Sequence, residues 1–314
     1  MPNPVDVRAL LDPEVAAALA AFPLALGTLS LDTLPMIRQA MAAMPPMPLS
    51  DAVARSDHDV TSRRGITVRV HRPKNATGTL PCVYWMHGGG LVLGTNKGDD
   101  LRFDRWCQRL DCVGVSVEYA LAPESRYPGP LEDCYAGLRW VRDNASSLGV
   151  DPGHIGVGGA SAGAGLAAGL ALLARDRGEI PLAFQALIYP MIDDRMITPS
   201  SAWDDPVWPP AANRFGWRSY LGELTGDAVP YYAAAARATD LTKLPRTFVS
   251  VGALDGFADE DIDYAVRLRH AGVPTELHVY PGAPHGFDGL APGTAIARRA
   301  NRDIEEWLAT ALRV

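Results

Sequence analysis

From residue 80 onward, short apolar runs alternate with longer segments of helical composition, and this alternation limits the fold more than any other feature. The runs are CVYWM, CVGVSVEY, IGVGG, FQALIY, TFVSVGAL and TELHVYP. Helix-like segments separate most of them, near residues 99–110, 131–148, 162–178, 258–271 and 294–312. Strands that are buried on both faces are continuous apolar runs, and helices between them connect parallel neighbours. The sequence therefore predicts an α/β fold, with a mostly parallel central sheet and helices on both faces.

Two stretches do not follow this alternation. The first, residues 1–50, contains two helix-like pieces, near 13–22 and 32–43, and ends in MPPMP, which is typical of a rigid linker. The second, residues 191–240, is rich in Trp, Pro and Asp, and this composition predicts an insertion above the sheet. We therefore expect a core domain of residues 51–190 and 241–314, an N-terminal helical segment of residues 1–50, and an insertion of residues 191–240.

The segment GASAG, residues 159–163, joins a predicted strand to an Ala-rich predicted helix. A nucleophilic Ser in a G-x-S-x-G turn must expose its hydroxyl at the carboxyl end of the strand, which imposes an unfavourable backbone conformation on it. Side chains two residues before and after would collide, so Gly159 and Gly163 fit this role for Ser161. A Gly-rich phosphate loop or simple helix–sheet packing is the alternative.

The segment MHGGGLVLG, residues 86–94, follows the predicted strand CVYWM and presents consecutive backbone N–H groups with no Cβ atoms around them. Such groups can converge on an oxygen that gains negative charge during acyl transfer. We expect the N–H groups of Gly88, Gly89 and Ala162 to form this oxyanion hole, and His87 to hold the loop. A flexible loop or an anion-binding nest is the alternative.

A Ser hydroxyl needs a base to take its proton and an acid to orient that base. Of the seven His residues, His285 alone lies in a loop after the last predicted strand, in PGAPHGF. For the acid, Asp255 directly follows one predicted strand, whereas its rivals Asp193 and Asp194 follow another. The order Ser161, Asp255, His285 is the order of nucleophile, acid and base in α/β-hydrolases.

Composition and charge argue against several other classes of function. The chain has a net charge of −7 and no run of Lys and Arg, so nucleic acid and anionic membranes are poor partners. No stretch is long and apolar enough to span a bilayer, and the apolar residues 15–27 lack the preceding positive charge of a signal peptide. No metal-ligand spacing relates the four Cys residues, Cys82, Cys107, Cys112 and Cys134. We therefore expect a cytoplasmic protein with reduced thiols that needs no metal or organic cofactor.

Together these motifs resemble those of the bacterial hormone-sensitive-lipase-like esterases, family IV of the α/β-hydrolase superfamily. The match spans roughly residues 64–312, in HGGG, EYALAPESRYPGPLEDCYAGLRWV (118–141), GASAG, YPMIDDR (189–195), GALDGF and PHGF. The resemblance implies an α/β-hydrolase catalytic domain under a helical cap built from the N-terminal segment and the insertion. It also implies either a homodimer through the last strand and helix or a monomer.

The chain departs from the family pattern at two positions. Ala160 stands where the family usually has Asp or Thr, which removes a side-chain hydrogen bond beside the nucleophile. Leu91 replaces the common aromatic residue after the glycines, which would reshape the acyl pocket. Glu124 and Asp133, in the LAPE and LED segments, would either support the site or be plain surface acids.

The sequence therefore predicts a serine carboxylesterase that hydrolyses short- to medium-chain esters, which are small-molecule substrates, through an acyl-enzyme. The expected walls of an apolar substrate pocket are Leu91, Met36, Trp203, Trp208, Phe215 and Trp217, unless these side chains form only an ordinary cap core. The same triad could instead cleave amides, carbamates or lactones, or transfer acyl groups to an alcohol. A non-catalytic ligand receptor on this fold is a more distant alternative, because such receptors usually lack a triad member.

Overall fold

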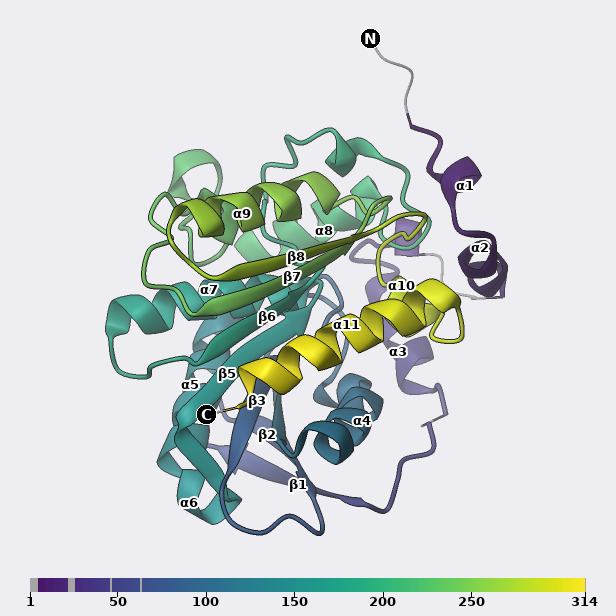
Figure 1. Cartoon of the computed structure of the whole chain (residues 1–314). Coiled ribbons are helices and arrows are strands. Elements are labelled where there is room, and N and C mark those ends of the chain that lie inside the picture. The colour runs from purple at the N-terminus through teal and green to yellow at the C-terminus, as the bar shows by residue number, and fades with distance from the viewer. Residues whose placement is uncertain (1–4, 22–25, 46, 63, 314) are drawn as a thin grey trace.

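The computed structural model describes residues 5–21, 26–45, 47–62 and 64–313, and in this part of the chain the centre is an eight-stranded sheet (Figure 1). The strands are β1 Val53–Val60, β2 Ile66–Pro73, β3 Leu80–Met86, β4 Val113–Glu118, β5 Val150–Ala160, β6 Phe184–Ile188, β7 Arg246–Gly252 and β8 Thr275–Tyr280. Their spatial order is β1-β2-β4-β3-β5-β6-β7-β8. The β1–β2 and β2–β4 pairs are antiparallel, and the other pairs are parallel. The prediction of an α/β fold with a mostly parallel sheet is confirmed.

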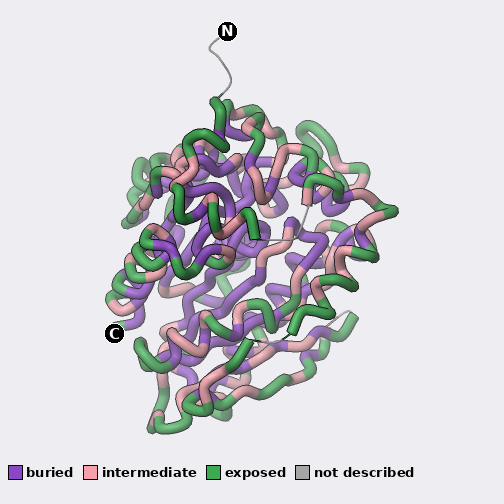
Figure 2. Tube along the Cα trace, turned by 90° about the vertical axis from the view of Figure 1, so that its right-hand side faces the viewer, coloured by how far each residue is buried: buried purple, intermediate pink, exposed green. Residues whose placement is uncertain are grey.

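Helices cover both faces of this sheet because side chains along each strand alternate between two apolar layers. On β3, Val83 and Trp85 belong to one layer, and Tyr84 and Met86 belong to the other. The first layer includes α4 Asp100–Leu110 and α11 Ala295–Ala311, and the second includes α5 Gly129–Asp143, α7 Ala162–Arg177 and α9 Ala258–His270. Figure 2 shows buried residues along the central strands and exposed residues on the outer surface.

Shorter elements complete the described fold. They are α6 Ala145–Leu148, α10 Phe287–Leu290 and the 3-10 turns Leu26–Thr28, Asn96–Asp99, Ser200–Ala202, Gly226–Ala228 and Ala235–Arg237. The segment predicted as one helix near 131–148 is divided at Asn144 into α5 and α6. The Asn144 side chain donates to the carbonyl oxygen of Trp140, and this local hydrogen bond competes with the helical backbone pattern.

The N-terminal segment forms the helices α1 Val7–Leu10, α2 Pro13–Ala20 and α3 Leu34–Ala42. α2 begins after Asp12, whose Oδ1 accepts hydrogen bonds from the N–H groups of Glu14 and Val15, as a helix N-cap does. Both helices predicted near 13–22 and 32–43 are present. Phe22 of the first, and Pro46 of the predicted linker, lie outside the described residues.

Residues 191–240 contain α8 Pro210–Leu221 and lie against the N-terminal segment. Arg8 Nε lies 3.9 Å from Asp204 Oδ2, and α8 contacts the 3-10 turn Leu26–Thr28. This contact fits a cap made of both segments, although the boundaries of the cap and catalytic domains stay a prediction. Among the described helices, none combines the length and hydropathy that crossing a membrane requires.

Glu124 and Asp133 each hold a loop near the carboxyl ends of the strands. Arg38 of α3 donates from Nη1 to Glu124 Oε1 at 2.7 Å and from Nη2 to the Ala122 carbonyl oxygen at 2.8 Å. Glu124 therefore joins the N-terminal segment to the core, and this contact lowers the pKa of its carboxyl group. Asp133 is buried and accepts a hydrogen bond from the N–H of Ala120.

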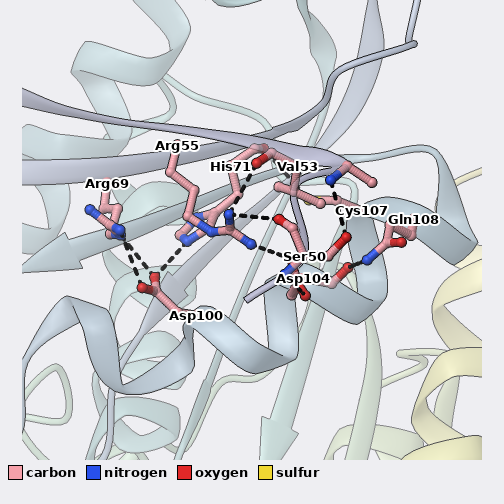
Figure 3. Close-up of polar contacts among 10 residues, drawn as sticks. Ser50, Val53, Arg55, Arg69, His71, Asp100, Asp104, Cys107 and Gln108 are labelled. Atoms are coloured by element: carbon pink, nitrogen blue, oxygen red, sulfur yellow. Dashed lines mark hydrogen bonds and ion pairs between the residues drawn. The ribbon is translucent and has the colours of Figure 1, made fainter. Parts of the chain in front are cut away.

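The apolar pattern does not predict β1, because VARSDHDV places charged residues along a strand at the sheet edge. Its charged side chains, with those of β2, take part in a polar network against α4 (Figure 3). Arg69 Nε and His71 Nε2 each lie 2.8 Å from Asp100 Oδ1, and Arg55 pairs with Asp104. Charges on an edge strand also oppose pairing with another chain, so this composition suits the position.

Candidate active site

Ser161 lies in the sharp turn between β5 and α7. Its backbone has a φ of 57° and a ψ of −124°, a strained conformation for a residue with a side chain. A Cβ at residue 159 would lie 2.3 Å from the carbonyl carbon of Gly163, and a Cβ at residue 163 would lie 2.1 Å from the carbonyl oxygen of Met86. The predicted steric requirement for glycine at both positions is therefore confirmed.

Two loops from later in the chain bring an acid and an imidazole to this Ser. Asp255 follows β7, and His285 follows β8. His285 Nε2 lies 2.8 Å from Ser161 Oγ, and His285 Nδ1 lies 2.7 Å from Asp255 Oδ2. The exposed fraction is 7% for Ser161, 5% for His285 and 1% for Asp255. This arrangement can move a proton from a hydroxyl to an imidazole and hold the resulting cation against a carboxylate.

The surroundings of His285 raise its pKa above the ordinary value of 6.5. Burial acts to lower the pKa, because it disfavours the charged imidazole. The carboxylates of Asp255, Asp205 and Asp288 act in the opposite direction and outweigh burial. The site therefore favours the protonated imidazole that a general base becomes when it accepts a proton.

The rival acids have other partners. Asp193 Oδ1 lies 2.7 Å from Arg195 Nε, and Asp194 Oδ1 lies 2.6 Å from Arg237 Nε. Of the three candidates, Asp255 is the one hydrogen-bonded to an imidazole in the described structure. No group of three or more His, Cys, Asp or Glu side chains among the described residues has an arrangement that could hold a metal ion.

The HGGG loop runs beside the turn that carries Ser161. A Cβ at residue 88 would lie 3.4 Å from Ser161 Cβ. In the described part of the chain, no hydrogen bond engages the backbone N–H groups of Gly88 and Gly89. Ala162 is the first residue of α7, where backbone N–H groups lack partners within the helix. Gly88 thus lies beside Ser161 and Ala162 follows Ser161 in the chain, and their N–H groups, with that of Gly89 in the same loop, stay the predicted donors to a negative oxygen.

Contacts with the core and with the N-terminal segment hold this loop in place. The His87 ring stacks on the Tyr119 ring with centroids 4.2 Å apart, and Tyr119 Oη donates to the His87 carbonyl oxygen at 2.7 Å. Arg38 Nε donates to the carbonyl oxygen of Val92 at 2.9 Å. Leu91 is buried with a φ of 67°, so the chain turns sharply after the glycines. The loop that carries the free N–H groups is therefore fixed at both ends.

The residues predicted to wall a substrate pocket do not all lie together. One apolar cluster contains Leu91, Trp208 and Trp217, with Phe215 packed against it. Trp203 packs against a different cluster, which contains Ala160 and Tyr189. Met36 is 64% exposed, so its position gives no support to the wall predicted for it. The periodicity of apolar residues in the sequence could not show which of these side chains lie together and which is exposed, because it does not place the cap relative to the sheet.

A cavity of about 320 Å³ lies between the N-terminal segment and the insertion. Its mainly apolar lining includes Leu11, Leu19, Leu26 and Val207. None of the six predicted pocket residues is among its described lining residues. Both parts of the predicted cap thus contribute to one apolar space, through residues that the sequence did not single out.

Two residues near His285 were not predicted from the sequence. The Tyr189 ring lies edge-on to the imidazole, with centroids 4.8 Å apart, and its Oη donates to Asp288 Oδ1 at 2.6 Å. Asp205 Oδ2 accepts a hydrogen bond from the backbone N–H of His285 at 2.8 Å. The sequence holds only weak signals for these two residues. Tyr189 directly follows a strand, and Asp205 begins a turn of a kind that Asp often forms.

Comparison with known proteins identifies the family. Residues 83–289, a range that contains Ser161, Asp255 and His285, match the family model described as alpha/beta hydrolase fold. The chain belongs to the α/β hydrolase fold family. This hydrolase is 33% identical over 309 residues to the esterase LipI of Mycobacterium tuberculosis, with 96% of each chain covered.

Solved structures of esterases resemble this hydrolase along almost its whole length. One is a bacterial heroin esterase, with 40% identity, a TM-score of 0.90, and 98% and 99% of the two chains covered. Another is the esterase LipW of Mycobacterium marinum, with 35% identity, a TM-score of 0.88 and 99% of each chain covered. The resemblance to the hormone-sensitive-lipase-like esterases is thereby confirmed.

Proposed function

We propose that this chain is a serine carboxylesterase for short- to medium-chain esters, with Ser161, Asp255 and His285 as its catalytic residues. The observation that carries the proposal is the hydrogen-bonded line from Ser161 Oγ through the imidazole to Asp255, with distances of 2.8 and 2.7 Å. The esterases that resemble the chain over nearly its full length support the same activity.

Acylation begins when Ser161 Oγ attacks the ester carbonyl carbon and its proton passes to His285 Nε2. The carbonyl oxygen becomes an oxyanion, which accepts hydrogen bonds from the N–H groups of Gly88, Gly89 and Ala162. Asp255 stabilises the imidazolium and keeps Nδ1 protonated. The tetrahedral intermediate then breaks its bond to the alcohol oxygen, and His285 returns the proton to that oxygen.

Deacylation repeats these steps with water as the nucleophile. A water molecule gives one proton to His285 Nε2 and attacks the carbonyl carbon of the acyl-enzyme. The second tetrahedral intermediate breaks its bond to Ser161 Oγ, which takes the proton back from the imidazole. The carboxylic acid leaves, and the enzyme returns to its starting state.

The activity is tested with p-nitrophenyl esters of increasing acyl length and with the p-nitroanilide of the best acyl group. We expect the highest kcat/KM for a short or medium acyl chain. We also expect slower cleavage of the anilide. Rates that rise steadily to long acyl chains, or an anilide cleaved faster than its ester, would contradict the proposal. Labelling by a serine-reactive phosphonate, mapped by mass spectrometry, identifies the nucleophile.

The raised pKa of His285 predicts the acidic limb of the pH profile. The reaction needs the neutral imidazole, which is lost as the pH falls through the pKa of His285. Because this pKa is raised from 6.5, kcat/KM should reach half its maximum at a pH above 6.5. The measurement is kcat/KM for p-nitrophenyl acetate between about pH 5 and 9. A midpoint below 6.5 would show that burial outweighs the surrounding carboxylates.

The cytoplasmic location and the homodimer stay predictions. For the location, the four Cys side chains are buried and free in the described structure, as in proteins that keep reduced thiols. For the homodimer, β8 is the edge strand of the sheet, and Val279 on it is 40% exposed. A second copy could therefore approach this edge.

A further inference from the structure

Asp205 is a buried carboxyl group in the insertion, between the 3-10 turn Ser200–Ala202 and α8. Its Oδ1 accepts hydrogen bonds from the N–H groups of Val207 at 2.7 Å and Trp208 at 2.9 Å. Its Oδ2 accepts from the backbone N–H of His285 at 2.8 Å. One side chain of the insertion thus binds the loop that carries the imidazole.

The three hydrogen bonds require two acceptor oxygens. A turn alone could be made by Asn, whose single oxygen can accept from Val207 and Trp208. The second position of the side chain would then hold an amide N–H, which faces the N–H of His285 and cannot accept from it. A carboxylate therefore fits this position better than any amide of the same shape.

The negative charge of Asp205 has no positively charged partner among the described residues other than the imidazole. Other buried carboxylates near the site form ion pairs, such as Asp193 with Arg195 and Asp288 with Arg102. Asp205 has only 1% of its surface exposed and forms no such pair in the described part of the chain. A buried charge of this kind is costly unless a charge of opposite sign forms beside it. Protonation of His285 supplies that charge.

The groups around the imidazole explain how Asp205 can act on it. Carboxylates of Asp255, Asp205 and Asp288 face His285, while the rings of Tyr189 and Phe257 flank it. Burial and the nearby Asp255 raise the pKa of Asp205 to about 6, and His285 limits this rise. The carboxyl group is therefore mostly ionised at neutral pH and loses its charge below about pH 6.

The same carboxylate also reaches the HGGG loop. It holds the backbone of Trp208, whose ring lies against Gly90, where a Cβ would come within 2.1 Å of Trp208 Cη2. The insertion is thus connected through Asp205 to the imidazole loop and through Trp208 to the loop with the free N–H groups. One short segment of the insertion therefore contacts both loops of the site.

We propose that Asp205 is a positioning residue of this enzyme, which fixes the His285 loop through its backbone and stabilises the protonated imidazole through its charge. The inference rests on the proposed esterase function and goes beyond it. It gives the insertion a part in the proton transfer, in addition to covering the substrate.

The test compares Asp205→Asn with the wild type in the pH dependence of p-nitrophenyl acetate hydrolysis. Removing the charge should lower the pKa of His285, so the acidic midpoint of kcat/KM should move down by about half a pH unit. The lost hydrogen bond should loosen the imidazole loop and lower kcat about 10- to 30-fold, with KM changed less than about 3-fold. A purely structural role would lower activity without moving the midpoint.

The control is Asp193→Asn, which removes a buried carboxylate of the same insertion that is paired with Arg195. It should leave the midpoint unchanged. Circular dichroism checks the fold of each variant. If Asp205→Asn does not fold, the acidic midpoint, kcat and KM are measured on Asp205→Ser instead, and they test the inference in the same way. An unmoved midpoint in an active, folded Asp205 variant overturns the inference, whatever its kcat. A wild type that hydrolyses no ester overturns the proposed function itself, so the two failures are distinguishable.

Discussion

Replacing Ser161 with Ala should lower kcat/KM for p-nitrophenyl butyrate by at least about 10⁴-fold while the protein stays folded. The expected loss is large because the variant has no nucleophile for the acyl-enzyme, and His285 then has no hydroxyl to activate. The residual rate would come from binding and from the oxyanion N–H groups acting on attack by water. The fold should survive, since the change removes one oxygen atom from a side chain that is already small.

The measurement is steady-state hydrolysis by both proteins, with circular dichroism to compare their folds. Ser116→Ala is the matched control, because Ser116 is a fully buried hydroxyl on β4 with no hydrogen-bond partner in the described structure. It should keep wild-type activity within a factor of about 2. Turnover close to that of the wild type in Ser161→Ala would remove this residue from the mechanism.

Replacing Asp255 with Asn should lower kcat by about 10³- to 10⁴-fold with little change in KM. Asp255 Oδ2 lies 2.7 Å from His285 Nδ1 and keeps the proton on that nitrogen. An Asn amide facing Nδ1 would favour the other tautomer, with the proton on Nε2, which could no longer accept from Ser161. The stabilisation of the imidazolium would also be lost. Substrate contacts are unaffected, so the loss should fall on kcat.

The comparison with Asp194→Asn decides between the acids that the sequence left open. Asp194 pairs with Arg237, away from the imidazole, and its neutral variant should keep kcat within a factor of about 3. Steady-state kinetics on the two variants, with folds checked by circular dichroism, are sufficient. If Asp194→Asn loses activity and Asp255→Asn keeps it, the assignment of the acid is wrong.

Much of the fold was predictable because its signals are local. The apolar runs from CVYWM to TELHVYP identified six of the strands, β3 to β8. β1 was not predicted because an edge strand can carry charged residues on most of its length. The break between α5 and α6 at Asn144 was not predicted because a single polar residue within a helical pattern does not by itself end a helix.

The candidate site was predictable to a different degree at each residue. The need for glycine at residue 159 is a property of the turn itself, because a Cβ there would collide with Gly163, whereas a Cβ at residue 163 would collide with Met86 on β3, which only the packed sheet brings close. His285 was found by elimination, since the other His residues lie in or beside helices and strands or in HGGG. The exposure of Met36 and the contacts of Trp203 depend on how the cap packs, which no periodicity reveals.

By itself, the sequence determined the α/β class, the strained Ser turn and the glycine loop, and it predicted the chain order of a nucleophile, an acid and a base. Only the tertiary structure decided that Asp255, and neither Asp193 nor Asp194, meets the imidazole, and that Asp205 holds the same loop. The physical reason is the range of the interactions. Turn sterics and apolar periodicity act between residues a few positions apart, whereas a hydrogen bond between residues 205 and 285 exists only after the insertion has packed onto the sheet.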